Sequence, residues 1–366
     1  DTHSLAYKVL LNDKSKAMAK KLGLPDAHTA KICLDCHADN VKSEYRGVKF
    51  QLTDGVGCEA CHGGSEDWLA SHTRKEVTHQ ENIENGLYPL SNPEAKATLC
   101  LSCHLGTQDK LATHTIMGAG HPRLRFDMAV FSENQPRHYT PDDDYAARGK
   151  TELSPPNAWL SGLTESAVES LNLIDQHFDS GKVFPELALF DCHSCHHAMN
   201  DQRYNTSHGV APGAVRLNLS QAQLLIDVVA PLKLFSFGQI DLMKTHLLNM
   251  QKASQTSFKE VKKQRQLLAN DVAAIKQALN SATLDSLSWI QVRENILWHA
   301  SRGQYSDYIL AEQVFLALDT LTLALDEGAR YKPQLDAVFA AVQNESTFST
   351  DNFKIQTQKF HQALRQ

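Results

Sequence analysis

The cysteines of this 366-residue chain form four copies of one chemical unit. All eight follow the pattern Cys-x-x-Cys-His, and none is left over. Two thiols at this spacing can each form a thioether bond with one haem vinyl group, and the histidine that follows then becomes the proximal iron ligand. The pattern therefore predicts four covalently bound haem c groups. The units are Cys33, Cys36 and His37; Cys58, Cys61 and His62; Cys100, Cys103 and His104; and Cys192, Cys195 and His196.

Other uses of paired cysteines explain this pattern less well. Two Cys-x-x-Cys units can build a zinc site, and a single unit can act as a redox dithiol. Disulfide bonds are a third use, in exported proteins. None of these three uses requires a histidine after every second cysteine, so haem attachment is the prediction that we keep.

Histidines gather in the same part of the chain as the cysteines. Fifteen of the eighteen lie between His3 and His208, which is more than four irons need for two axial ligands each. A second histidine on an iron closes it against substrate and suits electron transfer. The candidates for the distal position are His3, His28, His72, His79, His114, His121, His138, His177, His193, His197 and His208.

His121 is the distal candidate that its neighbours favour most. It lies between Gly120 and Pro122, so we expect it on an ordered turn that suits a ligand. The alternative is a turn histidine that is hydrogen-bonded to the backbone or to a haem propionate. Methionine could replace a histidine, although core packing explains a methionine better. Weaker candidates are His114, His138 and His208, and the methionines are Met117, Met128 and Met199.

The composition fits an exported globular protein. A hydrophobic fraction of 42% argues against disorder, and no apolar run is long enough to cross a membrane. Haem attachment takes place outside the cytoplasm, so we expect a periplasmic protein whose signal peptide has already been removed. The net charge of −6, which haem propionates make more negative, argues against nucleic acid and favours redox partner proteins with basic patches.

The chain changes character near residue 210. Before this point, glycine, proline and aspartate clusters separate short segments, so residues 1–210 are predicted to form a loop-rich domain wrapped around four haems. After it, apolar residues recur at helical spacing, and residues 211–366 are predicted to form an antiparallel helical bundle. The expected fold class is mainly α. The bundle is either a docking or dimer surface or a module that only completes the fold.

The predicted helices of the bundle are bounded by capping signals. Gly303 and Gly328 each follow a helical pattern at the position where a helix C-cap prefers glycine. The expected ranges are about 221–229, 240–252, 258–279, 284–302, 304–327 and 351–364.

One stretch of the haem-binding segment resembles a known family. The run from Gly55 to Gly64, Gly-Val-Gly-Cys-Glu-Ala-Cys-His-Gly-Gly, has a haem motif shortly upstream and His72 shortly downstream. It is similar to the cytochrome c-554 type of multihaem cytochrome, whose best-known member accepts electrons from hydroxylamine oxidoreductase. The resemblance covers roughly residues 1–200.

The resemblance implies particular distal ligands. It makes His3 the ligand of the haem on His62, and His177 the ligand of the haem on His104. It also makes His72 a ligand of another haem, which here is the haem on His196. The chain departs from the family in lacking the haem motif at the N-terminus and in having an additional motif late in the segment.

The haem on His37 decides between two functions. Its counterpart in the resembled family has no distal protein ligand, which makes it the candidate open haem for a reaction on a small nitrogen or sulfur compound. The alternative is that His28 or His121 fills the position. Because distal histidines are plentiful, we favour an electron carrier over a multihaem oxidoreductase.

Overall fold

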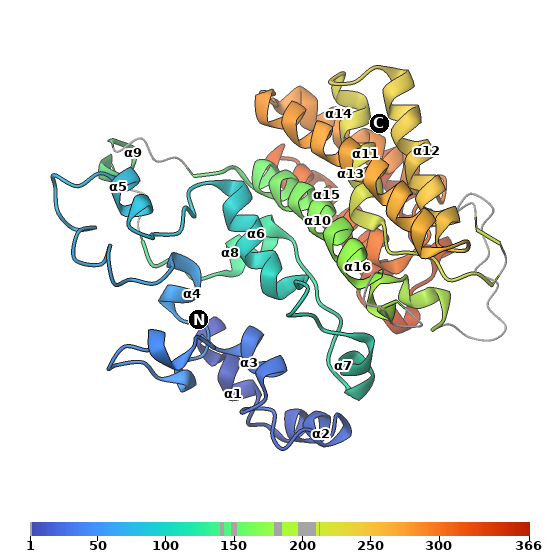
Figure 1. Ribbon diagram of the computed structural model, residues 1–366. Helices are drawn as coiled ribbons and strands as arrows, with labels where there is room; N and C mark the ends of the chain where they lie inside the picture. Colours follow the sequence, from blue (N-terminus) through green and yellow to red (C-terminus); the bar gives the residue numbers. More distant parts are fainter. Residues whose placement is uncertain (1, 140–142, 148–151, 179–184, 197–209, 212) are drawn as a thin grey trace. The chain divides into compact units, whose positions relative to one another are not determined.

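The structure is a computed structural model that describes residues 2–139, 143–147, 152–178, 185–196, 210–211 and 213–366 (Figure 1). Within these ranges the fold is mainly α, as predicted, and no β-strand forms beyond one isolated bridge between Phe190 and Leu217. Every helix in the described part of the chain is too short or too polar to cross a bilayer.

The chain divides into two compact units. Unit 1 consists of Asp1–Phe126 and Phe131–Glu152, and unit 2 consists of Asp127–Val130 and Leu153–Gln366. The units therefore separate by packing near residue 152, and the fourth haem motif falls in unit 2. Our predicted boundary at residue 210 divides the chain by haem attachment instead, and it stays a prediction.

Unit 1 is built from short helices, and three of them end on a proximal histidine. The helices α3 (Lys31–His37), α4 (Cys58–His62) and α6 (Pro93–His104) each carry a haem motif in their last turns. Asn92 caps α6 and Pro93 is its first residue, an arrangement that favours a helix start. The other helices of unit 1 are α1 (Ala6–Val9), α2 (Asp13–Lys21), α5 (His79–Glu84), α7 (His114–Ala119) and α9 (Asp143–Ala147), with α8 (Met128–Asn134) crossing the division.

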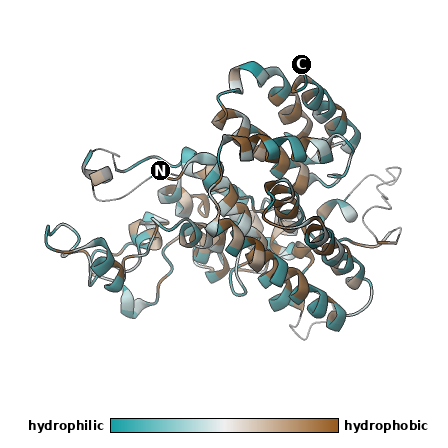
Figure 2. Ribbon diagram, turned by 90° about the horizontal axis from the view of Figure 1, so that it is seen from above, coloured by the Kyte–Doolittle hydropathy of each residue, from teal (hydrophilic) through white to brown (hydrophobic). Residues whose placement is uncertain are grey.

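Unit 2 is a set of longer helices that pack on one another. The helices are α10 (Pro155–Phe178), α11 (Ser220–Val229), α12 (Phe237–Ala253), α13 (Phe258–Ser281), α14 (Ser286–Ala300), α15 (Tyr308–Ala324), α16 (Gly328–Val342) and α17 (Thr350–Ala363). Helix α10 packs on α11, α13 and α15, and each helix from α14 to α17 packs on the next. Figure 2 shows hydrophobic and hydrophilic residues side by side around these helices, as in amphipathic helices that share a core.

Each of the six predicted helices of the bundle has an observed counterpart, and for the range 304–327 this is α15. The ranges 221–229, 240–252, 258–279, 284–302 and 351–364 are confirmed by α11, α12, α13, α14 and α17. Gly303, with φ of 72°, has the left-handed conformation expected of a glycine that ends a helix. Short loops and neighbour-on-neighbour packing are compatible with the antiparallel arrangement that we predicted.

The prediction that Gly328 ends a helix is wrong. Helix α15 ends at Ala324, the left-handed residue that follows is Asp326, and Gly328 is the first residue of α16. A Cβ atom at residue 328 would lie 2.5 Å from Leu323 Cδ2, so close packing explains this glycine. Helix α16 was not predicted because it contains Pro333, which usually interrupts a helix.

The expectation of a loop-rich segment up to residue 210 is also wrong in one place. Helix α10 runs over 24 residues from Pro155 to Phe178 and buries Trp159 and Ile174. We had interpreted Pro155 and Pro156 as a break, but proline is well suited to the first turn of a helix, where its missing N–H has no intrahelical partner to lose. Gly162 lets this helix approach Met128, which explains why residues 127–130 pack with unit 2.

Candidate haem-binding sites

In unit 1 each proximal histidine faces a second histidine from elsewhere in the chain. The two rings of each pair are close to perpendicular, and their centres are separated by similar distances in all three cases. The pairs are His37 with His121 (6.3 Å between ring centres, 88° between ring planes), His104 with His3 (6.1 Å, 83°) and His62 with His138 (5.8 Å, 80°).

This spacing fits two axial ligands on one iron. A metal-bound imidazole nitrogen lies about 2 Å from the metal and about 1 Å from the centre of its own ring. Two imidazoles on opposite sides of an iron therefore have ring centres about 6 Å apart, which agrees with all three pairs. The described residues contain no group of three or more His, Cys, Asp or Glu side chains suited to a metal. A haem iron needs only two protein ligands, whereas a structural zinc site needs four.

Hydrogen bonds fix the orientation of the rings in the first pair. His37 Nδ1 lies 3.0 Å from the Ala6 carbonyl oxygen, and His121 Nδ1 lies 2.7 Å from the Pro122 carbonyl oxygen. When Nδ1 donates its proton to a carbonyl, Nε2 is the nitrogen that can bind a metal. This second contact is characteristic of metal-binding histidines, so both residues fit an iron ligand.

Burial favours the neutral form of three of the paired histidines. It lowers the pKa of His62, His104 and His121 below the usual value, and the facing histidine lowers each pKa further. The neutral imidazole is the form that binds a metal.

The Gly-Val-Gly run before the second haem motif holds one of the distal histidines. A Cβ atom at Gly55, which has φ of 74°, would lie 2.8 Å from the His3 carbonyl oxygen, and the Val56 N–H donates to the same oxygen at 3.1 Å. Gly57 N–H donates to Asp39 Oδ2 at 3.1 Å. The glycines therefore allow the close backbone approach that places His3.

Two haem motifs of unit 1 meet at their cysteines. The Cys36 and Cys103 thiols lie close enough for each to shift the pKa of the other, upward for Cys36 and downward for Cys103, and Lys110 Nζ lies 3.2 Å from Cys103 Sγ. In a haem-loaded chain these two sulfur atoms would each carry the edge of a haem. The haems on His37 and His104 would therefore have neighbouring edges.

The facing rings of unit 1 are not the pairs that the family resemblance implied, and which histidine binds which iron stays a prediction. His3 lies opposite His104 rather than opposite His62, and His138, which we had rated a weaker candidate, lies opposite His62. His177 belongs to unit 2 and His104 to unit 1, so the pairing of these two residues stays a prediction.

Two further candidates for a distal ligand, His72 and His28, pack against other aromatic rings. His72 packs against the Trp68 ring, and its Nδ1 lies 2.6 Å from the Leu69 carbonyl oxygen. It belongs to unit 1 and His196 to unit 2, so the pairing of these two residues stays a prediction. His28 packs against Tyr7 rather than His37.

The proximal ligand of the candidate open haem, His37, has His121 facing it. His121 lies opposite His37 with a separation that fits an iron between the two rings. The alternative in which His121 is the sixth ligand, which its position before proline suggested, stays a prediction that this separation fits.

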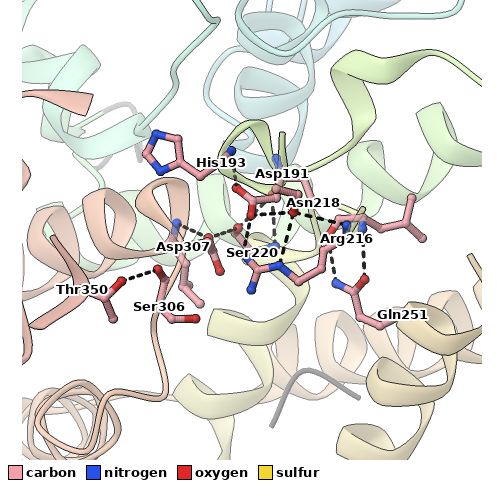
Figure 3. Close-up of polar contacts among 12 residues, drawn as sticks. Asp191, His193, Arg216, Asn218, Ser220, Gln251, Ser306, Asp307 and Thr350 are labelled. Atoms are coloured by element: carbon pink, nitrogen blue, oxygen red, sulfur yellow. Dashed lines mark hydrogen bonds and ion pairs between the residues drawn. The ribbon is translucent and has the colours of Figure 1, made fainter. Parts of the chain in front are cut away.

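A buried ion pair holds the fourth haem motif on unit 2 (Figure 3). Asp191, directly before Cys192, forms an ion pair with Arg216, and the two side chains are 7% and 11% exposed. Asp191 also accepts hydrogen bonds from His193 N–H at 3.2 Å and from Ser194 Oγ at 3.1 Å. The carboxylate therefore fixes the turn that contains Cys192 and orients the guanidinium that neutralises it.

The ion pair belongs to a larger polar network. Asp307 Oδ1 accepts hydrogen bonds from Ser220 Oγ at 3.1 Å and from Leu310 N–H at 2.9 Å (Figure 3). Burial, and then the neighbouring Asp191 charge, raises the pKa of Asp307. The network ties the turn before the haem motif to the start of α15.

His193, another distal candidate from the sequence, lies in unit 2, and a ligand role for it stays a prediction. Its ring is buried beside Tyr308 and Phe348, at 5.7 Å and 6.2 Å between ring centres, and Nε2 lies 3.8 Å from Glu345 Oε1. These contacts anchor the haem motif in the core of unit 2. His197, His208 and Met199 lie outside the described residues.

Unit 2 also contains a cavity of about 710 Å³ beside Arg216. Its buried Asp227 accepts a hydrogen bond from Tyr305 OH at 3.1 Å and contacts Lys244 Nζ at 2.9 Å and His299 Nε2 at 3.4 Å. These polar groups bond to one another, so they stabilise the packing of α11, α12 and α14.

Comparison with known families agrees with the arrangement of unit 1. Residues 1–63 match the family model for cytochrome c554 and c-prime. The chain resembles this family of c-type cytochromes. The matched segment contains the first two haem motifs, the Gly-Val-Gly run and His3. A search of curated proteins gives no match, and a search of solved structures gives none either. The family match supports a c-type cytochrome that takes part in electron transfer with covalently bound haem c.

Proposed function

We propose that this protein is a periplasmic tetrahaem cytochrome that carries electrons between redox partner proteins. The observation that supports the proposal most strongly is the set of three facing histidine pairs in unit 1. An iron with two histidine ligands has no position for a substrate, so it can exchange electrons but cannot bind a reactant. Three closed irons favour a carrier over an enzyme.

The chain supplies the ligands and fixes their geometry. When bound, the haems supply the one-electron chemistry of iron. The cysteines hold the haems, and the histidine pairs influence the reduction potentials of the irons. Cys36 and Cys103 bring two haem edges together, which suits electron transfer from one haem to the next. The ion pair of Asp191 with Arg216 positions the fourth motif.

The overall charge limits the choice of partner. The chain has a net charge of −6, and haem propionates add negative charge. Over most of this protein's surface, long-range attraction therefore favours a partner that presents a basic patch. An electron carrier needs both a donor and an acceptor. We therefore expect a second docking surface whose charge differs from that of the rest of the chain.

The number of haems tests the proposal. Mass spectrometry of the purified holoprotein should give the mass of the chain plus four haems, and the alkaline pyridine haemochrome should give four haems per chain. The variant Cys192→Ala/Cys195→Ala should lose one haem and keep three, because each motif holds its own group. Fewer than four haems in the wild type, or an unchanged haem count in the variant, would overturn the assignment of this motif.

A further inference from the structure

We propose that the outer surface of helices α1 and α2 is a docking site for an acidic redox protein. We call this the lysine surface and define it by the exposed lysines of the two helices. The inference rests on the proposed electron-carrier function and adds the site and the charge of one partner. The lysines are Lys8, Lys14, Lys16, Lys20 and Lys21.

The two helices point their lysines outward because both pack on one core cluster. The same buried cluster contains Tyr7 of α1, Leu10 directly after α1 and Ala19 of α2. In α2, Ser15 and Ala19 form the buried face, and Lys16 and Lys20, each about 100° further round the helix, are exposed beside it. The exposed residues of both helices therefore cover one small lobe of unit 1.

This lobe adjoins the first histidine pair. The Ala6 carbonyl of α1 accepts the hydrogen bond from His37 Nδ1, and α2 packs against α7, the helix directly before His121. Lys21 Nζ donates to the Ala119 carbonyl oxygen at 3.1 Å. A partner on the lysine surface would thus dock next to the haem that these two histidines hold, which shortens the path for an electron.

The local charge is opposite to the charge of the whole chain. Residues 5–21 contain five lysines and one aspartate, Asp13, whereas the net charge of the chain is −6. Asp13 pairs with Lys16 at 3.3 Å, and both side chains are exposed. Charges are screened over about 8 Å at physiological salt, so a partner in contact with this lobe senses the lysines more than distant carboxylates. The surface therefore fits an acidic partner.

Apolar side chains lie among the lysines, as in a short-lived protein interface. Leu5 and Val9 are four positions apart and remain 48% and 46% exposed, and Ile32, beside Cys33 of the haem motif, is 50% exposed. An interface commonly has apolar contacts at its centre and a polar rim. Such a surface suits a transient complex in which charge attraction steers the partner into place and apolar contacts then stabilise it.

Charge reversal at matched positions tests the proposal. The reduced protein would be mixed in a stopped-flow instrument with oxidised acidic plastocyanin, so that one electron passes from a ferrous haem to Cu(II) and leaves ferric haem and Cu(I). The variant Lys8→Glu/Lys16→Glu/Lys20→Glu should react about tenfold more slowly than the wild type at low salt. The wild-type rate should fall as salt rises.

The control has the same change in net charge at another place. Lys252→Glu/Lys259→Glu/Lys359→Glu alters three exposed lysines of unit 2 and should change the rate much less. An equal slowing in both variants, or a wild-type rate that rises with salt, would overturn the docking site. The haem count and redox titration of each variant report on the carrier function separately, because failed docking leaves both unchanged.

Discussion

Replacing His121 with alanine is expected to open one iron. The wild-type ring lies opposite His37, and the separation of 6.3 Å between ring centres fits an iron held by both. Without the imidazole, the haem on His37 should change from low spin to high spin. The reduced variant should therefore bind one more equivalent of carbon monoxide per chain than the reduced wild type, measured by absorbance titration.

His28→Ala is the matched control for this experiment. His28 was the other sequence candidate for the same position, but its ring packs against Tyr7 at 6.5 Å between ring centres. This variant should bind carbon monoxide as the wild type does. If His28→Ala opened an iron and His121→Ala did not, the ligand assignment of the first pair would be wrong.

Arg216→Ala is expected to destabilise unit 2 by about 3–5 kcal/mol, because it leaves the buried Asp191 carboxylate without its counter-charge. For a unit of this size the loss corresponds to a thermal midpoint lower by roughly 10 °C. The turn at Cys192 also depends on Asp191, so mobility near the fourth haem should increase. Far-ultraviolet circular dichroism during heating measures the shift, since unit 2 contains the long helices.

Lys332→Ala is the control for the ion pair. Lys332 pairs with Asp336 at 2.7 Å within α16, and both side chains are largely exposed. Water screens this pair, so its loss should cost no more than about 0.5 kcal/mol. Equal shifts in the two variants would show that burial of Asp191 and Arg216 does not have the effect that we assign to it.

The haem motifs and the helical class could be predicted from sequence because both are local signals. Cys-x-x-Cys-His needs only five consecutive residues, and the amphipathic pattern of α13 is contained in its own range. Helix α10 was missed because a proline pair marks either a break or a helix start, and only the buried face of the following residues distinguishes the two.

The ligand pairs could not be predicted because they join distant parts of the chain. The His3 ring faces His104 from the other end of unit 1's sequence, and the backbone contacts of Gly55 and Val56 that hold His3 are described by no spacing rule. The family resemblance implies His62 as the partner of His3, whereas the His3 ring faces His104 in the structure. His121 could be singled out from sequence because proline and glycine mark its turn locally, and its ring faces His37.

Low-temperature electron paramagnetic resonance of the oxidised holoprotein tests the closed irons most directly. Near-perpendicular imidazole planes, at 80° to 88°, should give strongly axial low-spin signals that together account for at least three irons per chain. Those signals should not change when nitric oxide or hydroxylamine is added under non-reducing conditions. High-spin signals from two or more irons would contradict the paired-histidine account and would favour the alternative function, a multihaem oxidoreductase with an open haem.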